Sequence, residues 1–145
     1  MALSIKPYIE NKERIHLIGI GGVSMNSLGE LLLSRGVPVS GSDRLRTDVT
    51  ARLEALGAKI TYEHKPENVE GASLIVRTAA VHDDNPEIVR AHELGIPVME
   101  RAEAWGHLMR DYDNVVCLAG THGKTTSTSM MTLMTMEAQM DPTIT

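Results

Sequence analysis

The fold is decided by the stretch Ile15-His16-Leu17-Ile18-Gly19-Ile20-Gly21-Gly22-Val23-Ser24. Its first six residues are mostly apolar and predict a buried strand. Residues 24–35 place apolar side chains at helical spacing and predict a helix that ends at Gly36. The glycines therefore fall at a strand-to-helix turn, where backbone N–H groups and a helix N-terminus can bind an anion. Ser24 replaces the third glycine of the dinucleotide-binding pattern G-x-G-x-x-G, so the match is incomplete.

Short apolar runs alternate with helical patterns along the chain as far as Arg110. Further strands are predicted at 37–40, 59–62, 74–77 and 96–99, and further helices at 48–56, 85–94 and 101–110. This alternation predicts an α/β fold, a Rossmann-like and mostly parallel sheet with helices on both faces. Residues 1–13 are polar and mixed, and we expect them to form a leader onto this domain.

Asp43 follows the second predicted strand, about 20 residues after the glycine-rich turn. An acidic residue at this place typically hydrogen-bonds a ribose or a base edge, which favours binding of a nucleoside diphosphate. The alternative is a tight turn with a surface aspartate in the turn-prone run Ser40-Gly41-Ser42-Asp43. The separation between the two features favours the nucleotide interpretation.

A second glycine-rich turn reads Ala119-Gly120-Thr121-His122-Gly123-Lys124-Thr125-Thr126. The apolar run 115–118 before it predicts a buried strand, and 128–139 after it predicts a helix. Loop N–H groups and Lys124 suit the outer phosphates of a nucleoside triphosphate, and Thr125 is placed to ligate Mg²⁺. The pattern G-x-x-x-x-G-K-[ST] requires a glycine at position 118, where the chain has Leu118. The alternative is a simple glycine-rich turn, but two such turns in one chain indicate nucleotide binding coupled to ATP use.

Three other residue sets are predicted to be structural. Cys117 lies among apolar neighbours and predicts a buried, inert thiol. Trp105 is predicted to pack rather than to bind a ligand, because the chain has no Phe and needs another bulky side chain to fill its core. Met130, Met131 and Met134 predict the core-facing side of the last helix.

The composition excludes several classes of protein. The chain has 145 residues, enough for one domain but not for two full ones. A net charge of -5 and a pI near 5.6 argue against a nucleic-acid surface. The N-terminus lacks the apolar core of a signal peptide and no run is long enough to span a bilayer, so we expect a cytoplasmic location without membrane insertion. One cysteine excludes an internal disulfide, and the six histidines form no ligand-like sequence cluster, so no zinc site is predicted.

Together these motifs resemble the Mur ligase family of peptidoglycan synthesis, from about Arg14 to the last residue. The resemblance rests on the two glycine-rich turns and on Ser40-Gly41-Ser42-Asp43, Asn85-Pro86-Glu87 and Arg101-Ala102-Glu103. Within the family, His122 is similar to both the alanine-adding and the peptide-recycling branches, whereas the Gly-Ile-Gly-Gly form of the first turn resembles the alanine-adding branch more closely. The chain departs from the common family pattern at Ser24, Thr78-Ala79, Trp105 and His107.

The resemblance implies a three-domain enzyme, of which residues 14–110 form the UDP-sugar domain and 111–145 the start of the central ATP-binding domain. It implies that ATP, with Mg²⁺, phosphorylates the carboxylate of UDP-N-acetylmuramate, and that L-alanine attacks the acyl phosphate to form an amide. The implied UDP-sugar residues are Gly19, Gly21, Gly22, Val23, Ser24, Asp43, Thr78 and Ala79. The implied ATP residues are Gly120, Thr121, His122, Gly123, Lys124, Thr125 and Thr126, with Lys124 stabilising the transferred phosphoryl group and Thr125 holding Mg²⁺.

Two alternatives remain at this stage. One is the recycling ligase of the same family, which joins a tripeptide to the same sugar nucleotide. The other is a nicotinamide-dependent oxidoreductase domain, which accounts for the first turn and Asp43 but does not require the second turn. The remaining Mg²⁺ ligands and the amino-acid site would lie outside this sequence, so we expect the chain alone to bind the UDP-sugar weakly and to show no ligase turnover. The sequence gives no prediction of oligomeric state.

Overall fold

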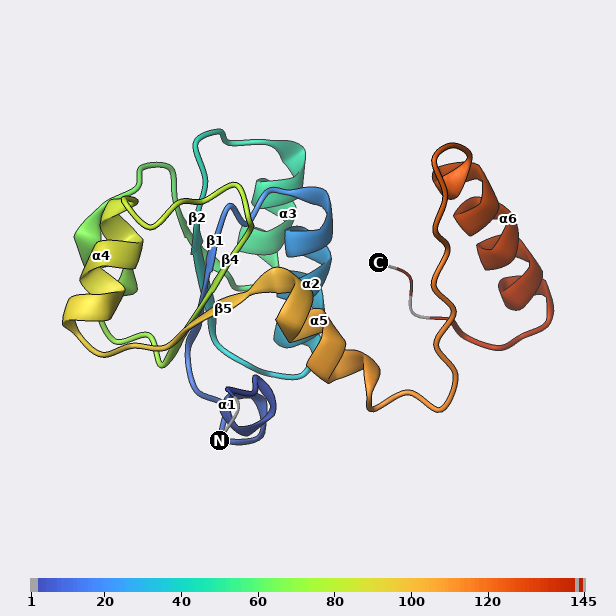
Figure 1. The fold of residues 1–145 in the computed structure, drawn as a ribbon, viewed down its shortest axis with the longest axis horizontal. Coiled ribbons are helices and arrows are strands. Elements are labelled where there is room, and N and C mark those ends of the chain that lie inside the picture. The colour runs from blue at the N-terminus through green and yellow to red at the C-terminus, as the bar shows by residue number, and fades with distance from the viewer. Residues whose placement is uncertain (1–2, 143, 145) are drawn as a thin grey trace. The chain divides into compact units, whose positions relative to one another are not determined.

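A five-stranded parallel sheet organises the first of two compact units into which the chain divides, Met1–Asp111 and Tyr112–Thr145. The computed structural model describes residues 3–142 and 144 (Figure 1). The strand order is β3-β2-β1-β4-β5, and every adjacent pair is parallel. The strands are β1 (Ile15–Ile18), β2 (Val39–Ser42), β3 (Lys59–Thr61), β4 (Leu74–Arg77) and β5 (Val98–Glu100). The predicted α/β, Rossmann-like class is confirmed.

Helices cover both faces of this sheet. The helices of this unit are α1 (Lys6–Glu10), α2 (Val23–Ser34), α3 (Asp48–Ala55), the 3-10 turn η1 (Pro66–Val69), α4 (Pro86–Glu93) and α5 (Arg101–Met109). Apolar residues of α2, α3 and α5 form one core cluster with β1 and β2, whereas α4 and η1 form a second cluster with Ile18 and Ile75. Figure 1 accordingly shows α4 on one side of the sheet and α2, α3 and α5 on the other.

The central strand β1 is buried along its whole length because β2 and β4 flank it and the two apolar clusters cover its faces. Leu17 faces the cluster of α2, while Ile18 faces that of α4, as the period of two in a strand requires. Gly41 on β2 has no room for a side chain. A Cβ there would lie 2.7 Å from Cδ1 of Ile20 and 2.8 Å from the carbonyl oxygen of Leu17.

Local signals set the start of several helices. The Thr47 side chain accepts a hydrogen bond from the Thr50 N–H, and the Thr50 hydroxyl oxygen accepts one from the Thr47 N–H, which forms the capping box of α3. At α4 the Asn85 side chain accepts from the Glu87 N–H at 2.9 Å, and Pro86 follows at the first helical position.

The structure differs from the sequence prediction at the beginning of the chain. Residues 1–13, expected to be a polar leader, include α1, whose Ile9 is buried together with the adjoining Ile5 in the main core. The strand predicted at 37–40 begins at Val39 instead. Pro38 precedes it and has no N–H to donate to a neighbouring strand, although its carbonyl accepts from the Ile15 N–H at 3.1 Å.

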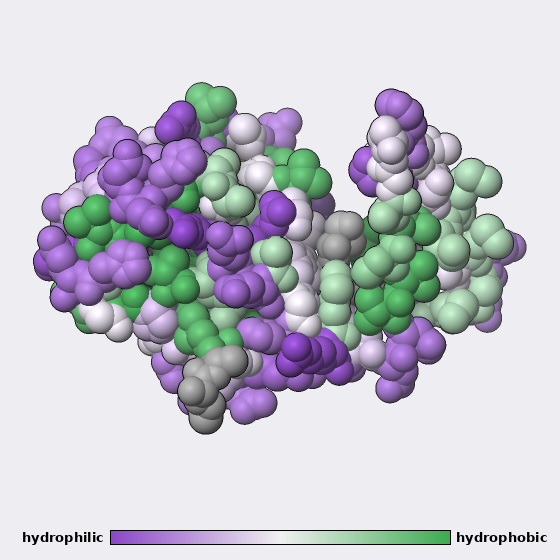
Figure 2. All heavy atoms as spheres, in the orientation of Figure 1, coloured by the Kyte–Doolittle hydropathy of each residue, from purple (hydrophilic) through white to green (hydrophobic). Residues whose placement is uncertain are grey.

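The second unit contains α6 (Lys124–Glu137), which begins four positions before the predicted helix. The strand predicted at 115–118 is wrong for this structure, since none of the described residues pairs with it and its side chains are exposed. An apolar run becomes a buried strand only beside a partner strand. Cys117 in this run is exposed, and so are Met130, Met131 and Met134, which were also predicted to be buried but lie on α6, where none of the described residues is buried. Figure 2 shows much of this unit coloured as apolar.

Within the part of the chain that the structure describes, no helix has both the length and the apolar character needed to cross a membrane.

Candidate functional site

The first glycine-rich turn lies where the strand order changes direction. From β1 the chain continues into α2 on one face, and from β4 it continues into α4 on the other. The loops after these two neighbouring strands therefore diverge at the carboxyl edge of the sheet, which is where open α/β sheets bind ligands. Thr78, just beyond β4, lies beside Gly19, since its Cγ2 atom is 3.8 Å from the position of a Cβ on Gly19. The structure thus brings two of the predicted sugar-nucleotide residues together.

Backbone hydrogen bonds to the end of β2 fix the shape of this turn. The N–H groups of Gly19 and Ile20 both donate to the carbonyl of Ser42, at 2.8 Å and 3.1 Å. The Gly22 N–H donates back to the Gly19 carbonyl at 3.1 Å. Gly19 has a φ of +80°, in the left-handed region that glycine tolerates best.

Asp43 ties the turn to β2. Its Oδ2 accepts from the Gly21 N–H at 2.8 Å, and its Oδ1 accepts from the N–H groups of Arg44 at 2.7 Å and Leu45 at 3.3 Å. A Cβ on Gly21 would lie 2.9 Å from Oδ2 of Asp43 and 3.1 Å from Cγ2 of Thr50, so a side chain there would displace the Asp43 carboxylate. Both carboxylate oxygens of Asp43 already accept from backbone N–H groups, so a ribose hydroxyl would have to share an oxygen with one of these donors. The sequence predicted contact with the ligand but missed this internal role.

The open donors of the turn are the first two N–H groups of α2. Among the described residues no acceptor is found for the N–H groups of Val23 and Ser24. They point outward at a helix N-terminus, where the helix dipole adds favourable potential for an anion. Trp105 on α5 donates its indole Nε1–H to the Ser24 carbonyl at 3.2 Å and is 7% exposed. The predicted packing residue therefore also holds the first turn of α2 in place.

The loop after β4 forms the other wall of the site. Thr78 is half-buried, Ala79 is exposed, and the Thr78 carbonyl accepts from the Val81 N–H at 3.0 Å. The guanidinium of Arg77 donates to the Val81 carbonyl at 3.2 Å and pairs with Asp83. Arg77 thus constrains the loop that carries Thr78 and Ala79.

A buried polar network lies on the α4 face of the same strands. Glu87 on α4 is fully buried, and four side chains surround its carboxylate. The donors are His16 Nε2 (3.3 Å) and Asn68 Nδ2 (2.7 Å) to Oε1, and Ser42 Oγ (2.7 Å) and His64 Nδ1 (2.8 Å) to Oε2. Because a carboxylate only accepts, both histidine nitrogens must carry protons. Nδ1 of a neutral His16 then accepts from the Ser40 hydroxyl at 2.9 Å.

These hydrogen bonds keep Glu87 ionised. Burial alone would raise the pKa of the carboxyl group, but the donors from His16, Asn68, His64 and Ser42 outweigh it and lower the pKa from 4.5 to about 2. The sequence prediction missed this cluster because its members lie far apart in the chain. The usable signal was His16 in an otherwise apolar strand, with Ser40 opposite it in the parallel register.

The second glycine-rich turn leads into α6 in the second unit. Gly123, with a φ of +77°, precedes α6, and Lys124 Nζ donates to the Gly120 carbonyl at 2.6 Å. Among the described residues, no acceptor is found for the backbone N–H groups of Lys124, Thr125 and Thr126. The helix N-terminus and the lysine ammonium therefore form a second potential anion site. Thr121, His122, Thr125, Thr126 and Ser127 are exposed, and Thr128 is half-buried.

No three His, Cys, Asp or Glu side chains gather into a metal-binding group in residues 3–142. The Thr125 hydroxyl is a hard oxygen donor of the kind that Mg²⁺ accepts beside nucleotide phosphates. The second turn therefore offers one protein ligand, the Thr125 hydroxyl, that suits the predicted Mg²⁺.

The parallel sheet with a glycine-rich turn at its switch point defines the Rossmann-like class. The profile described as "Mur ligase family, catalytic domain" matches residues 14–113. The chain belongs to the Mur ligase family.

Several relatives share this similarity. The UDP-N-acetylmuramate–L-alanine ligase of Clostridium novyi is 47% identical over 135 residues, which cover 93% of this chain and 30% of that protein. The solved UDP-N-acetylmuramate–alanine ligase of Thermotoga maritima has a TM-score of 0.82 at 36% identity, covering 88% of this chain and 30% of that one. A murein peptide ligase of Psychrobacter arcticus also has a TM-score of 0.82, at 27% identity, covering 88% of this chain and 27% of its own. The chain thus spans less than a third of the length of these relatives.

Proposed function

We propose that this chain carries the UDP-sugar site and the ATP phosphate loop of a ligase that adds L-alanine to UDP-N-acetylmuramate. The observation that carries the proposal is the pair of N–H groups of Val23 and Ser24, for which the described residues provide no acceptor, at the switch point of a Mur-family sheet. Relatives named as alanine ligases at 47% identity support the choice of amino acid.

In this proposal the diphosphate of UDP-N-acetylmuramate binds at the N-terminus of α2. The Val23 and Ser24 N–H groups donate to it, and Gly21 and Gly22 let it approach the backbone closely. Gly19, Thr78 and Ala79 form the adjacent walls, and Asp43 keeps the turn in the binding shape while offering its outer lone pairs to the uridine.

The second turn is assigned to ATP. The N–H groups of the loop, from Gly120 through Thr121, His122 and Gly123 to Thr126, would surround the β- and γ-phosphates. Lys124 would move from the Gly120 carbonyl to the transferring phosphoryl group and stabilise its charge. Thr125 would hold Mg²⁺, which when bound neutralises charge on the phosphate oxygens.

The proposed reaction proceeds in two steps. The carboxylate of UDP-N-acetylmuramate attacks the γ-phosphorus of ATP, which forms an acyl phosphate and releases ADP. The amine of L-alanine then attacks the acyl carbon, inorganic phosphate leaves, and an amide bond forms with loss of the ammonium proton. We place this ATP-consuming reaction in the cytoplasm and expect no turnover from the 145 residues alone.

The two alternatives receive less support. The recycling ligase shares the fold, but its solved relative is 27% identical, compared with 36% for the solved alanine ligase. A nicotinamide-dependent domain would not require the second glycine-rich turn at Gly120 to Thr126, and the profile that matches residues 14–113 is that of the Mur ligase family.

Calorimetric titration tests the proposal with the chain as it exists. UDP-N-acetylmuramate should bind with measurable heat, and NADH should not. Trp105, the single tryptophan, should change its fluorescence on binding because its indole touches the Ser24 carbonyl. Heat from NADH together with none from UDP-N-acetylmuramate would overturn the proposed function and favour the oxidoreductase alternative.

A further inference from the structure

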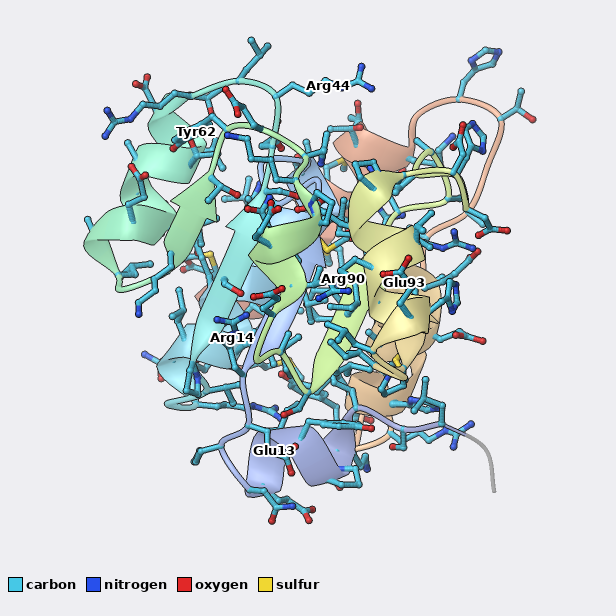
Figure 3. All side chains as sticks on the ribbon, turned by 90° about the vertical axis from the view of Figure 1, so that its left-hand side faces the viewer. Glu13, Arg14, Arg44, Tyr62, Arg90 and Glu93 are labelled. Atoms are coloured by element: carbon cyan, nitrogen blue, oxygen red, sulfur yellow. The ribbon has the colours of Figure 1, made fainter. Side chains whose placement is uncertain are left out.

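The position of Glu87 is unusual for a charged side chain. It lies on the inner face of α4 with the buried residues Ile88 and Ala91, whereas Arg90 and Glu93, labelled in Figure 3, pair on the exposed part of the same helix. Burying a carboxylate is costly unless donors satisfy it, and an apolar side chain could fill such a place without that cost. Stability alone therefore gives a weak reason for a glutamate here.

The network connects Glu87 to the glycine-rich turn through one residue. Ser42 donates its hydroxyl to Oε2 of Glu87 at 2.7 Å. The carbonyl of the same serine accepts the N–H groups of Gly19 and Ile20, and the next residue, Asp43, accepts the N–H of Gly21. Three consecutive N–H groups of the turn are thus fixed by two residues, one of which is held from behind by Glu87.

From this connection we propose that Glu87 is a positioning residue for the sugar-nucleotide site. By holding Ser42, its carboxylate sets the conformation of the turn whose N–H groups receive the diphosphate. Glu87 itself lies on the other face of the sheet from α2 and does not contact the ligand. The inference rests on the proposed function for the identity of the ligand, and on the observed hydrogen bonds for the link between Glu87 and the turn.

Two variants break the link at different points. Glu87→Gln keeps the shape of the side chain but replaces one acceptor oxygen with an amide donor, which conflicts with the surrounding donors. Ser42→Ala removes only the hydroxyl and leaves His16, His64 and Asn68 on the carboxylate. Glu93→Gln is the matched control, since Glu93 lies on the same helix and its side chain is 58% exposed.

The experiment combines affinity with a local structural signal. UDP-N-acetylmuramate binding is measured by calorimetry, and the amide chemical shifts of Gly19 and Ile20 are measured by NMR in the ligand-free chain. We expect both network variants to raise the Kd about tenfold or more. Both should also shift the Gly19 and Ile20 signals, whereas Glu93→Gln should change neither. A purely structural role for Glu87 would lower stability without moving these two amides or the Kd of the folded protein.

Each result decides the inference. If the wild-type chain binds and the folded network variants bind within twofold of it, Glu87 does not position the site and the proposed function stands. If the wild-type chain does not bind UDP-N-acetylmuramate, the proposed function fails. The positioning role is tested independently of binding, because unchanged amide signals of Gly19 and Ile20 in ligand-free Ser42→Ala would refute it. If Glu87→Gln does not fold, the Kd and the Gly19 and Ile20 amide shifts of Ser42→Ala alone test the positioning role. Weaker binding in Ser42→Ala but not in a folded Glu87→Gln would also overturn the inference.

Discussion

Replacing Gly41 with alanine should destabilise the chain where β2 packs against the end of β1. A Cβ at this position would lie 2.7 Å from Ile20 Cδ1, 2.8 Å from Ile20 Cβ and 2.8 Å from the Leu17 carbonyl oxygen. Two of these three atoms belong to the backbone or to its first side-chain carbon, so rotation of a side chain cannot relieve the overlap. Inserting a methyl group into a packed core typically costs about 1–3 kcal/mol. We expect the upper part of that range, about 2–3 kcal/mol, because Leu17 lies in a fully buried strand and Ile20, in the turn after it, is also fully buried.

Urea denaturation followed by Trp105 fluorescence measures the effect. With a slope of about 1–3 kcal/mol per molar urea, the midpoint should fall by roughly 1 M or more. Gly106→Ala is the matched control, because a Cβ on this exposed α5 residue has no neighbour within 4 Å. Alanine in a helix interior is favoured over glycine by about 0.5–1 kcal/mol, so the control should be slightly more stable than wild type. A Gly41→Ala variant as stable as wild type would refute the packing described for β1 and β2.

The remaining predictions concern acid stability and the two turns. Glu87 is held ionised with a pKa near 2 instead of 4.5, so its contribution of about 3 kcal/mol is present above pH 4.5 and lost as the pH falls toward 2. Unfolding free energies measured from pH 6 to 2 should show this loss in wild type but not in Glu87→Gln. An equal dependence of the unfolding free energy on pH in both proteins would contradict the prediction. Asp43→Asn leaves one oxygen for three N–H groups and should weaken UDP-N-acetylmuramate binding about tenfold by calorimetry, with unchanged affinity as the contrary result. In a protein of the same length as its relatives, Lys124→Ala should lower ATP turnover by at least about a hundredfold in a phosphate-release assay. Retained turnover would remove Lys124 from catalysis.

Most of the sheet was predictable because its signals are local. The strand at 74–77 was predicted with its observed bounds, since it is a short apolar run before a turn. The start of α4 followed from Asn85-Pro86, where the Asn side chain caps the helix and proline takes its first position. These features depend on a few neighbouring residues, and no distant contact overrides them.

The features that were missed depend on partners far away in the sequence. The hydrogen bonds of Glu87 require the register that places His16 beside Ser40 and Ile18 beside Ser42, which no local pattern contains. Residues 115–118 have the composition of a strand, but a strand also needs a neighbour to pair with. Asp43 was predicted as a ligand contact from its spacing alone, whereas its three backbone donors appear only in the folded turn.

The central claim is that the sugar nucleotide binds at the switch point between β1 and β4. Titrating the isotope-labelled chain with UDP-N-acetylmuramate and following its backbone amides by NMR tests it most directly. We predict that the largest shifts occur at Val23 and Ser24, with smaller ones at Gly19 and Thr78 on the two walls. Saturable binding whose shifts leave these four amides unchanged, or no binding at all, would contradict the claim.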